Sequence, residues 1–165
     1  MSYKTSTKIY LLLALIVLAT GGLGLHLRIH PVAQNHSNLI ALLSGIISIV
    51  LVPLLFISKK TTGYAYVING MMVIIGTITM FHFLLVHRPA PFTASSFFLK
   101  TLLPDILLLW GNFFVGRALF ELEFHGYDAE HAHAGIFYRY PNNGWWAVHL
   151  AALSLIYWAG HALWR

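Results

Sequence analysis

The sequence predicts an all-α integral membrane protein, a bundle of five transmembrane helices joined by short loops. Apolar residues make up 58% of its 165 residues, charged residues only 9%, and the mean hydropathy is +0.73. A soluble domain carries about 25% charged residues, so this chain has too few to cover a water-facing surface. Disordered chains are polar and rich in charge. Because this length suits one domain, residues 1–165 are expected to form a single transmembrane domain.

Long stretches without Asp, Glu, Lys or Arg locate most of the helices. A bilayer-crossing helix needs about 20 largely apolar residues, and four stretches are long enough. A fifth helix, fourth in chain order, is expected despite Asp105 and Arg117 because the residues between them are apolar. The expected helices cover residues 9–27, 38–57, 63–86, 99–120 and 144–164.

The segments between these stretches contain the signals that end and begin helices. Lys4 and Lys8 before an apolar run imitate a signal peptide, but the run continues to Leu25, so we expect a retained first helix. His30-Pro31 breaks that helix. Asn35 to Asn38 can cap the second helix, a tight turn covers residues 58–63, and two prolines at 89 and 91 favour an extended loop.

The basic residues are spread singly between apolar runs, so they report orientation in a membrane. Six fall on one side of the predicted bundle and four on the other, which predicts a cytoplasmic N-terminus and an external C-terminus. No nucleic-acid-binding motif is present, and the expected partners are the lipid bilayer and other membrane-protein subunits. The two groups are Lys4, Lys8, Lys59, Lys60, Arg117 and Arg139, against Arg28, Arg88, Lys100 and Arg165.

The residues that several kinds of catalytic or metal site require are absent from the sequence. The chain has no cysteine, which excludes disulfides, thiolate zinc sites, iron–sulfur ligation and cysteine nucleophiles. It has no Gly-rich phosphate loop, no G-x-S-x-G elbow and no H-E-x-x-H motif. A classical hydrolase, kinase or transporter is therefore disfavoured, and the sequence leaves open whether the chain is an enzyme.

Ten histidines are the most informative feature of the composition. The first, third and fifth helices run in the same direction, so their C-terminal ends share one membrane face, where the fourth helix begins. Counting residues inward from the bounding charges, His26, His82, His161 and Asp105 lie about 3 to 9 Å deep at 1.5 Å per residue. Four ionisable or ligating groups from four helices thus fall in one layer, where such residues usually face the bundle interior.

Three interpretations of this layer compete. In the first, haem b is ligated by His26 with His82 or by His82 with His161, and Arg28 and Arg88 balance its propionates. In the second, a copper, zinc or iron ion is held by the layer's histidines, chiefly His82 and His161, with Asp105. In the third, the histidines sit among lipid headgroups and Asp105 pairs with Arg88 or Lys100.

A polar track is predicted along the fourth helix. Asp105 and Asn112 are seven residues apart and share a helix face that leads toward Glu121. Arg117 points about 120° away and can pair with Glu121 at i, i+4, and His149 enters the last helix from the same side. This track fits a proton or quinone-headgroup path, or ordinary hydrogen bonds between helices.

The only sizeable polar segment is the predicted loop at residues 121–143. Asp128 with His131, and Glu130 with His133, have the i, i+3 spacing that places both side chains on one helical face. Glycines at 126 and 135 oppose a long helix there. A weak metal site and a solvated partner-docking loop are the two interpretations of this segment.

Together these features predict a small integral-membrane subunit of an electron-transfer complex, of respiratory or photosynthetic type, which binds haem b or borders a quinone site. Two alternatives are kept. One is a cofactor-free structural or assembly subunit of a membrane complex. The other is a His/Asp metal-dependent membrane enzyme or a proton or metal conduit.

Overall fold

A computed structural model describes residues 2–34, 36, 38–86, 93–126 and 142–164. Every regular element among these residues is helical, and five helical segments are long and apolar enough to cross a membrane. The prediction of five such helices is therefore confirmed. They cover Tyr3–Ile29, Asn38–Ile57, Thr62–Val86, Ala94–His125 and Asn143–Leu163.

Two of these segments contain a short π-helical turn just before a proline. The second segment runs through α2 (Asn38–Ile46), the π-turn η2 (Ile47–Leu51) and α3 (Val52–Ile57). The fourth runs through α5 (Ala94–Phe97), the π-turn η3 (Phe98–Leu102) and α6 (Leu103–His125). Pro53 and Pro104 each follow a π-turn. Proline lacks an N–H and its ring clashes with the carbonyl four residues earlier, and a π-turn widens the helix there.

The fourth segment extends beyond the predicted 99–120 at both ends. Its C-terminal extension contradicts the prediction that the polar loop starts at residue 121, because α6 continues through Glu121 and Glu123 to His125. Gly126 ends the helix with a positive φ of 64°, a conformation that glycine adopts without steric cost. The rest of the predicted loop, residues 127–141, lies outside the described residues.

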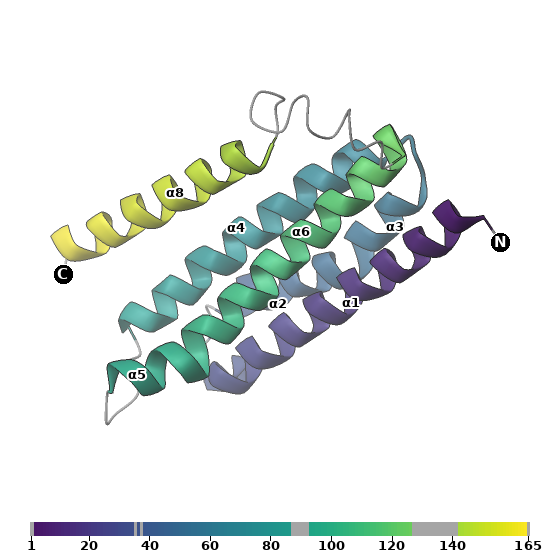
Figure 1. Cartoon of the computed structure of the whole chain (residues 1–165). Coiled ribbons are helices and arrows are strands. Elements are labelled where there is room, and N and C mark those ends of the chain that lie inside the picture. Colours follow the sequence, from purple (N-terminus) through teal and green to yellow (C-terminus); the bar gives the residue numbers. More distant parts are fainter. Residues whose placement is uncertain (1, 35, 37, 87–92, 127–141, 165) are drawn as a thin grey trace.

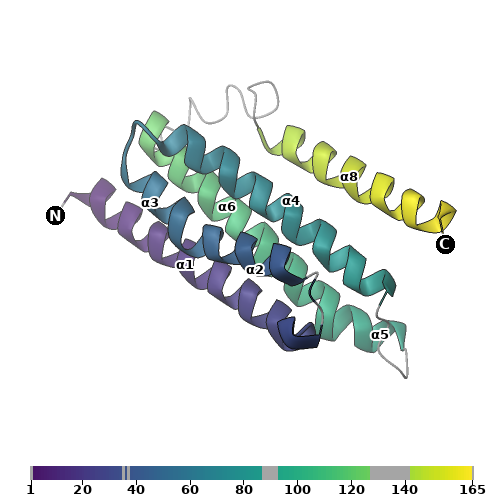
Figure 2. The same cartoon turned by 180° about the vertical axis from the view of Figure 1, so that it is seen from behind.

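Four of the segments form one bundle and the fifth packs on its outside (Figure 1). The helix α1 (Tyr3–Ile29) packs on α6, and α6 packs on α4 (Thr62–Val86), while α2 and α3 pack against α4 and α1. The last helix, α8 (Asn143–Leu163), packs chiefly on α4. The reverse view shows α8 on the far side of α4 and α6 from α1 and α2 (Figure 2).

The direction of each helix follows the predicted alternation. The C-terminal ends of α1, α4 and α8 lie at the same end of the molecule as α5, which precedes α6 (Figure 1). The chain termini lie at opposite ends. The parity argument that gathered His26, His82, His161 and Asp105 into one layer therefore rests on the correct helix directions.

The core lies toward the end of the bundle where the chain begins. Leu15, Phe56 and Phe113 are almost completely buried there, and Trp146 anchors α8 to them with 2% of its surface exposed. Gly70 of α4 makes this anchoring possible, since a Cβ atom at that position would come within 2.6 Å of the indole ring. The outer surface, by contrast, exposes large apolar side chains on every spanning segment.

Candidate functional site

The predicted layer of four groups divides into an inner and an outer cluster. His26 of α1 and Asp105 of α6 face the inside of the four-helix bundle and line one cavity. His82 of α4 and His161 of α8 lie instead where the last helix packs on the bundle, joined through Tyr157. The structure thus places these residues toward one end of the molecule but does not bring all four together.

His26 is held by a buried asparagine at the start of the second segment. Its Nε2–H donates to Asn38 Oδ1 over 3.0 Å, because an amide oxygen can only accept. The Asn38 amide nitrogen in turn donates to the backbone carbonyl of His30. Asn38, expected as a helix cap, therefore ties the end of α1 to the beginning of α2, and fixes which nitrogen of His26 carries the proton.

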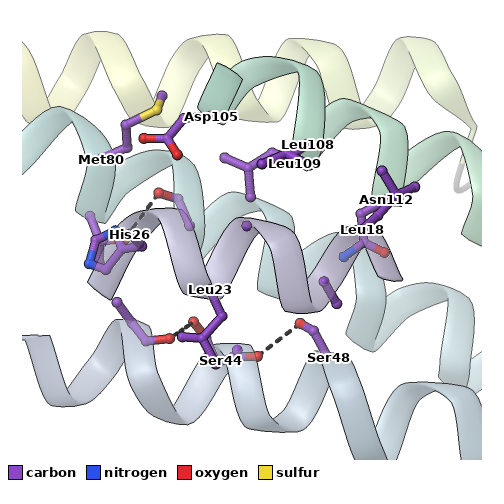
Figure 3. Close-up of a pocket in the computed structure, with 16 residues that line it drawn as sticks. Leu18, Leu23, His26, Ser44, Ser48, Met80, Asp105, Leu108, Leu109 and Asn112 are labelled. Atoms are coloured by element: carbon purple, nitrogen blue, oxygen red, sulfur yellow. Dashed lines mark hydrogen bonds between the residues drawn. The ribbon is translucent and has the colours of Figure 1, made fainter. Parts of the chain in front are cut away.

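The cavity beside His26 is enclosed by α1, α2, α4 and α6. The cavity has a volume of about 60 Å³, which is room for a few water molecules. Figure 3 shows His26, Asp105 and Met80 toward one end of the cavity and Asn112 toward the other.

Hydroxyl groups line the cavity with their donors already used. Ser44 donates to the carbonyl of Ala41 over 2.9 Å, and Ser48 donates to the carbonyl of Ser44 over 2.8 Å. Thr79 donates in the same way within α4. Because these hydrogens are bonded to the helix backbone, the hydroxyl oxygens remain available as acceptors for water in the cavity.

Asp105 is the group in this site whose burial costs the most free energy. Only 7% of it is exposed, and no ion pair joins it to another of the described residues. Lys100, an expected partner, is exposed, and Arg88 lies outside the described residues. A carboxylate buried among apolar side chains without a countercharge is costly. It needs a proton or water from the cavity to balance it.

The predicted track continues from Asp105 to the middle of the bundle. Asn112, 5% exposed, lines the same cavity, and its backbone carbonyl accepts a 3.2 Å hydrogen bond from the Asn69 side chain of α4. The side-chain oxygens of both asparagines are buried without a hydrogen-bond partner among the described residues. Sequence analysis missed Asn69, although it is the only amide side chain in the charge-free stretch 61–87.

The far end of α6 carries the charged groups. Arg117 Nε lies 3.7 Å from Glu121 Oε1, which confirms the expected i, i+4 pair. A second pair was missed: Lys8 Nζ lies 2.7 Å from Glu123 Oε1 and donates to the Ile57 carbonyl over 2.7 Å. This pair joins α1, α3 and α6, and a helix-by-helix reading of charges gives no signal for it.

His149 does not belong to this track. It lies on α8, outside the four-helix bundle, where Nδ1 donates to the Trp145 carbonyl over 2.7 Å. Its ring stacks on Trp145 with centroids 3.8 Å apart. The depth of His149 along its helix could be predicted by counting residues. Its neighbours could not, because they depend on where α8 packs.

Aromatic side chains pack around the histidines proposed as haem ligands. His82 Nδ1 is engaged by the Tyr157 hydroxyl, and Tyr157 stacks toward His161 with centroids 6.4 Å apart. Phe83 contacts the rings of both His26 and His82, at 5.5 and 5.6 Å. A histidine that ligates iron through one ring nitrogen commonly hydrogen-bonds through the other, so the Tyr157 contact at His82 Nδ1 is compatible with ligation through Nε2.

The other residues predicted to bind haem propionates or a metal ion do not form a site among the described residues. Arg28 is exposed at the end of α1. Within residues 2–34, 36, 38–86, 93–126 and 142–164, no three His, Asp or Glu side chains come close enough to hold a metal ion, so His82, His161 and Asp105 do not form a ligand set. Arg88, Asp128, Glu130, His131 and His133 lie outside those ranges.

The fold and site define a chain of five apolar helices with a polar cavity inside four of them. No family model matches the sequence, and neither a curated protein nor a solved structure is similar to it. The function is therefore argued from the cavity itself.

Proposed function

We propose that this chain is a small integral-membrane subunit of an electron-transfer complex that borders a quinone site, where Asp105 exchanges protons through the cavity. The observation that carries the proposal is the burial of Asp105 beside a polar, water-sized space in an otherwise apolar bundle. A buried carboxyl without a countercharge at membrane depth is more often functional than structural.

The surface of the bundle supports insertion into a bilayer. Exposed side chains on the spanning segments include Val17, Leu43, Leu107 and Ile156, which would meet lipid rather than water. The helices satisfy their own backbone groups, as hydrocarbon requires. The small excess of basic residues on the N-terminal side favours a cytoplasmic N-terminus.

Quinone chemistry explains why a proton acceptor would lie inside such a bundle. A quinone that takes up two electrons also takes up two protons, and a quinol releases both again. A subunit that borders the site must deliver or remove those protons at membrane depth. Asp105, the cavity and the acceptor oxygen of Asn112 form the first part of such a path, and Asn69 extends it toward the charged end of α6.

The short loops support a subunit rather than a free-standing enzyme. The turn between α3 and α4 contains only residues 58–61, so little chain is available there to bind a soluble substrate. Electrons would come from or go to a redox centre in another subunit. Haem ligation by His82 and His161 stays a prediction.

The proposal is tested in native membranes that carry Asp105→Asn. The amide keeps the shape of the carboxyl but cannot take up a proton, so quinone-dependent electron flux should fall at least tenfold while the complex still assembles. Leu107→Ala, a lipid-facing change on the same helix, is the matched control and should leave flux unchanged. Normal flux in assembled Asp105→Asn membranes would refute the proposal.

A further inference from the structure

A groove lies between the last helix and the rest of the bundle, on the opposite side of α4 and α6 from α1. Its volume is about 250 Å³. The groove exists because α8 is anchored at its N-terminal end by Trp146 and packs chiefly on α4, which leaves space beside α6. Its walls are Thr77, Met80 and Phe81 of α4, Ile106, Leu109 and Trp110 of α6, and Ala147, Leu150, Ala151 and Ser154 of α8.

The small residues of α8 create this groove. The spacing of Ala147, Ala151 and Ser154 is typical of a tight helix-packing face, but in the structure these residues line the open space and Leu150 makes the buried contact. Ala151 is exposed, so the groove opens onto the surface that would face lipid. A ligand dissolved in the bilayer can therefore enter without crossing a polar layer.

The groove adjoins the Asp105 cavity. Met80 and Leu109 line both spaces, so the two share part of their walls. Leu109 lies over Gly76, where a Cβ atom would come within 2.8 Å of it. The absence of that Cβ lets Leu109 settle against α4 and form part of the shared wall.

We propose that this groove binds the ring of a lipid-soluble quinone, next to the carboxyl that exchanges its protons. The inference rests on the proposed function and names its ligand site. A cavity of about 150 Å³ holds a benzene ring, so 250 Å³ accommodates a substituted quinone ring, whereas the inner cavity, at about 60 Å³, is too small for one. Trp110 and Phe81 supply aromatic faces, and the Ser154 hydroxyl and the Trp110 indole N–H are donors suited to quinone carbonyls. The acyl chains of a phospholipid have no acceptor atoms for these donors.

Quenching of tryptophan fluorescence tests the site. The full chain in mild detergent is titrated with a short-tailed benzoquinone, which quenches an indole that it touches. We expect saturable quenching, most of which disappears in Trp110→Phe. Ala151→Leu fills the groove and should weaken the apparent affinity at least tenfold, whereas Ala152→Leu, its neighbour outside the groove, should bind like the unchanged protein.

Further variants keep the test decisive. Ala147→Leu fills the groove from its other end, so it replaces Ala151→Leu if that variant loses its helical circular dichroism. Equal affinity in Ala151→Leu and Ala152→Leu, or quenching that survives Trp110→Phe, would overturn the groove. So would equal displacement by an alkane alcohol of the same tail length, which indicates an acyl-chain site.

The groove and the proposed function can fail separately. Asp105→Asn leaves the groove walls intact, so quinone binding should persist in that variant while electron flux is lost. Persisting binding with normal flux would refute the role of Asp105 but leave the groove standing. Lost flux in Asp105→Asn together with unchanged binding in Ala151→Leu would refute the groove alone.

Discussion

One of the tightest contacts between α8 and the bundle is the close approach of Trp146 to Gly70. A Cβ atom at position 70 would lie 2.6, 2.7 and 2.8 Å from three atoms of the indole ring, whereas ordinary contact begins at 3.4 Å. In Gly70→Ala the ring must therefore move by about 0.8 Å, in a site where Trp146 is 2% exposed. Overpacking of this kind costs about 1–3 kcal/mol, and the better helix propensity of alanine returns up to about 1 kcal/mol.

With that gain subtracted in full, we expect Gly70→Ala to lower the free energy of unfolding by about 0–2 kcal/mol. The measurement is unfolding in mixed micelles of increasing denaturing detergent, followed by circular dichroism. Gly24→Ala is the control, since a Cβ atom there meets nothing within 4 Å, and it should be neutral or stabilising. In a Trp146→Phe background the shorter ring should remove most of the Gly70→Ala penalty. Equal behaviour of Gly70→Ala and Gly24→Ala would refute this packing of α8.

Two further predictions concern the contacts that hold the other helices. Lys8→Met leaves Glu123 without its partner at 11% side-chain exposure and should destabilise the fold by about 1–3 kcal/mol, most of which Lys8→Met with Glu123→Leu should recover in the same unfolding assay. Asn38→Ala removes the acceptor of His26 and the donor to the His30 carbonyl just after α1, so amide hydrogen exchange at the junction of α1 and α2 should accelerate at least tenfold. Unchanged exchange there, or no recovery in the double variant, would contradict these contacts.

The sequence predicts the number, direction and approximate extent of the helices because each depends on the local run of residues. The gaps between charges define five apolar segments, and the alternation of direction follows from their count. The ends are harder to predict. The extension of α6 to His125 continues through Glu121 and Glu123, where charge was taken as the sign of a loop, and the π-turns before Pro53 and Pro104 have no signal in apolar periodicity.

The sequence predicted how deep each residue of the candidate site lies along its helix, but not which residues lie beside one another. Counting residues places His26, His82 and Asp105 at one level, but it cannot say which helix neighbours which. Because α8 packs outside the bundle, His82 meets Tyr157 rather than Asp105. Uncharged partners were also missed: Asn38 was expected only as a helix cap, because nothing in the local sequence indicates that its side chain also bonds to His26.

Redox-induced infrared difference spectroscopy tests the central claim most directly. The complex is purified from native membranes with its quinone, and spectra are recorded as the quinone is reduced and reoxidised electrochemically. If Asp105 exchanges protons with the quinone, a carbonyl-stretch band of a protonated carboxyl should change with the redox state, disappear in Asp105→Asn and persist in Glu123→Gln. The same band in the Asp105→Asn protein would contradict the assignment of Asp105 as the proton acceptor.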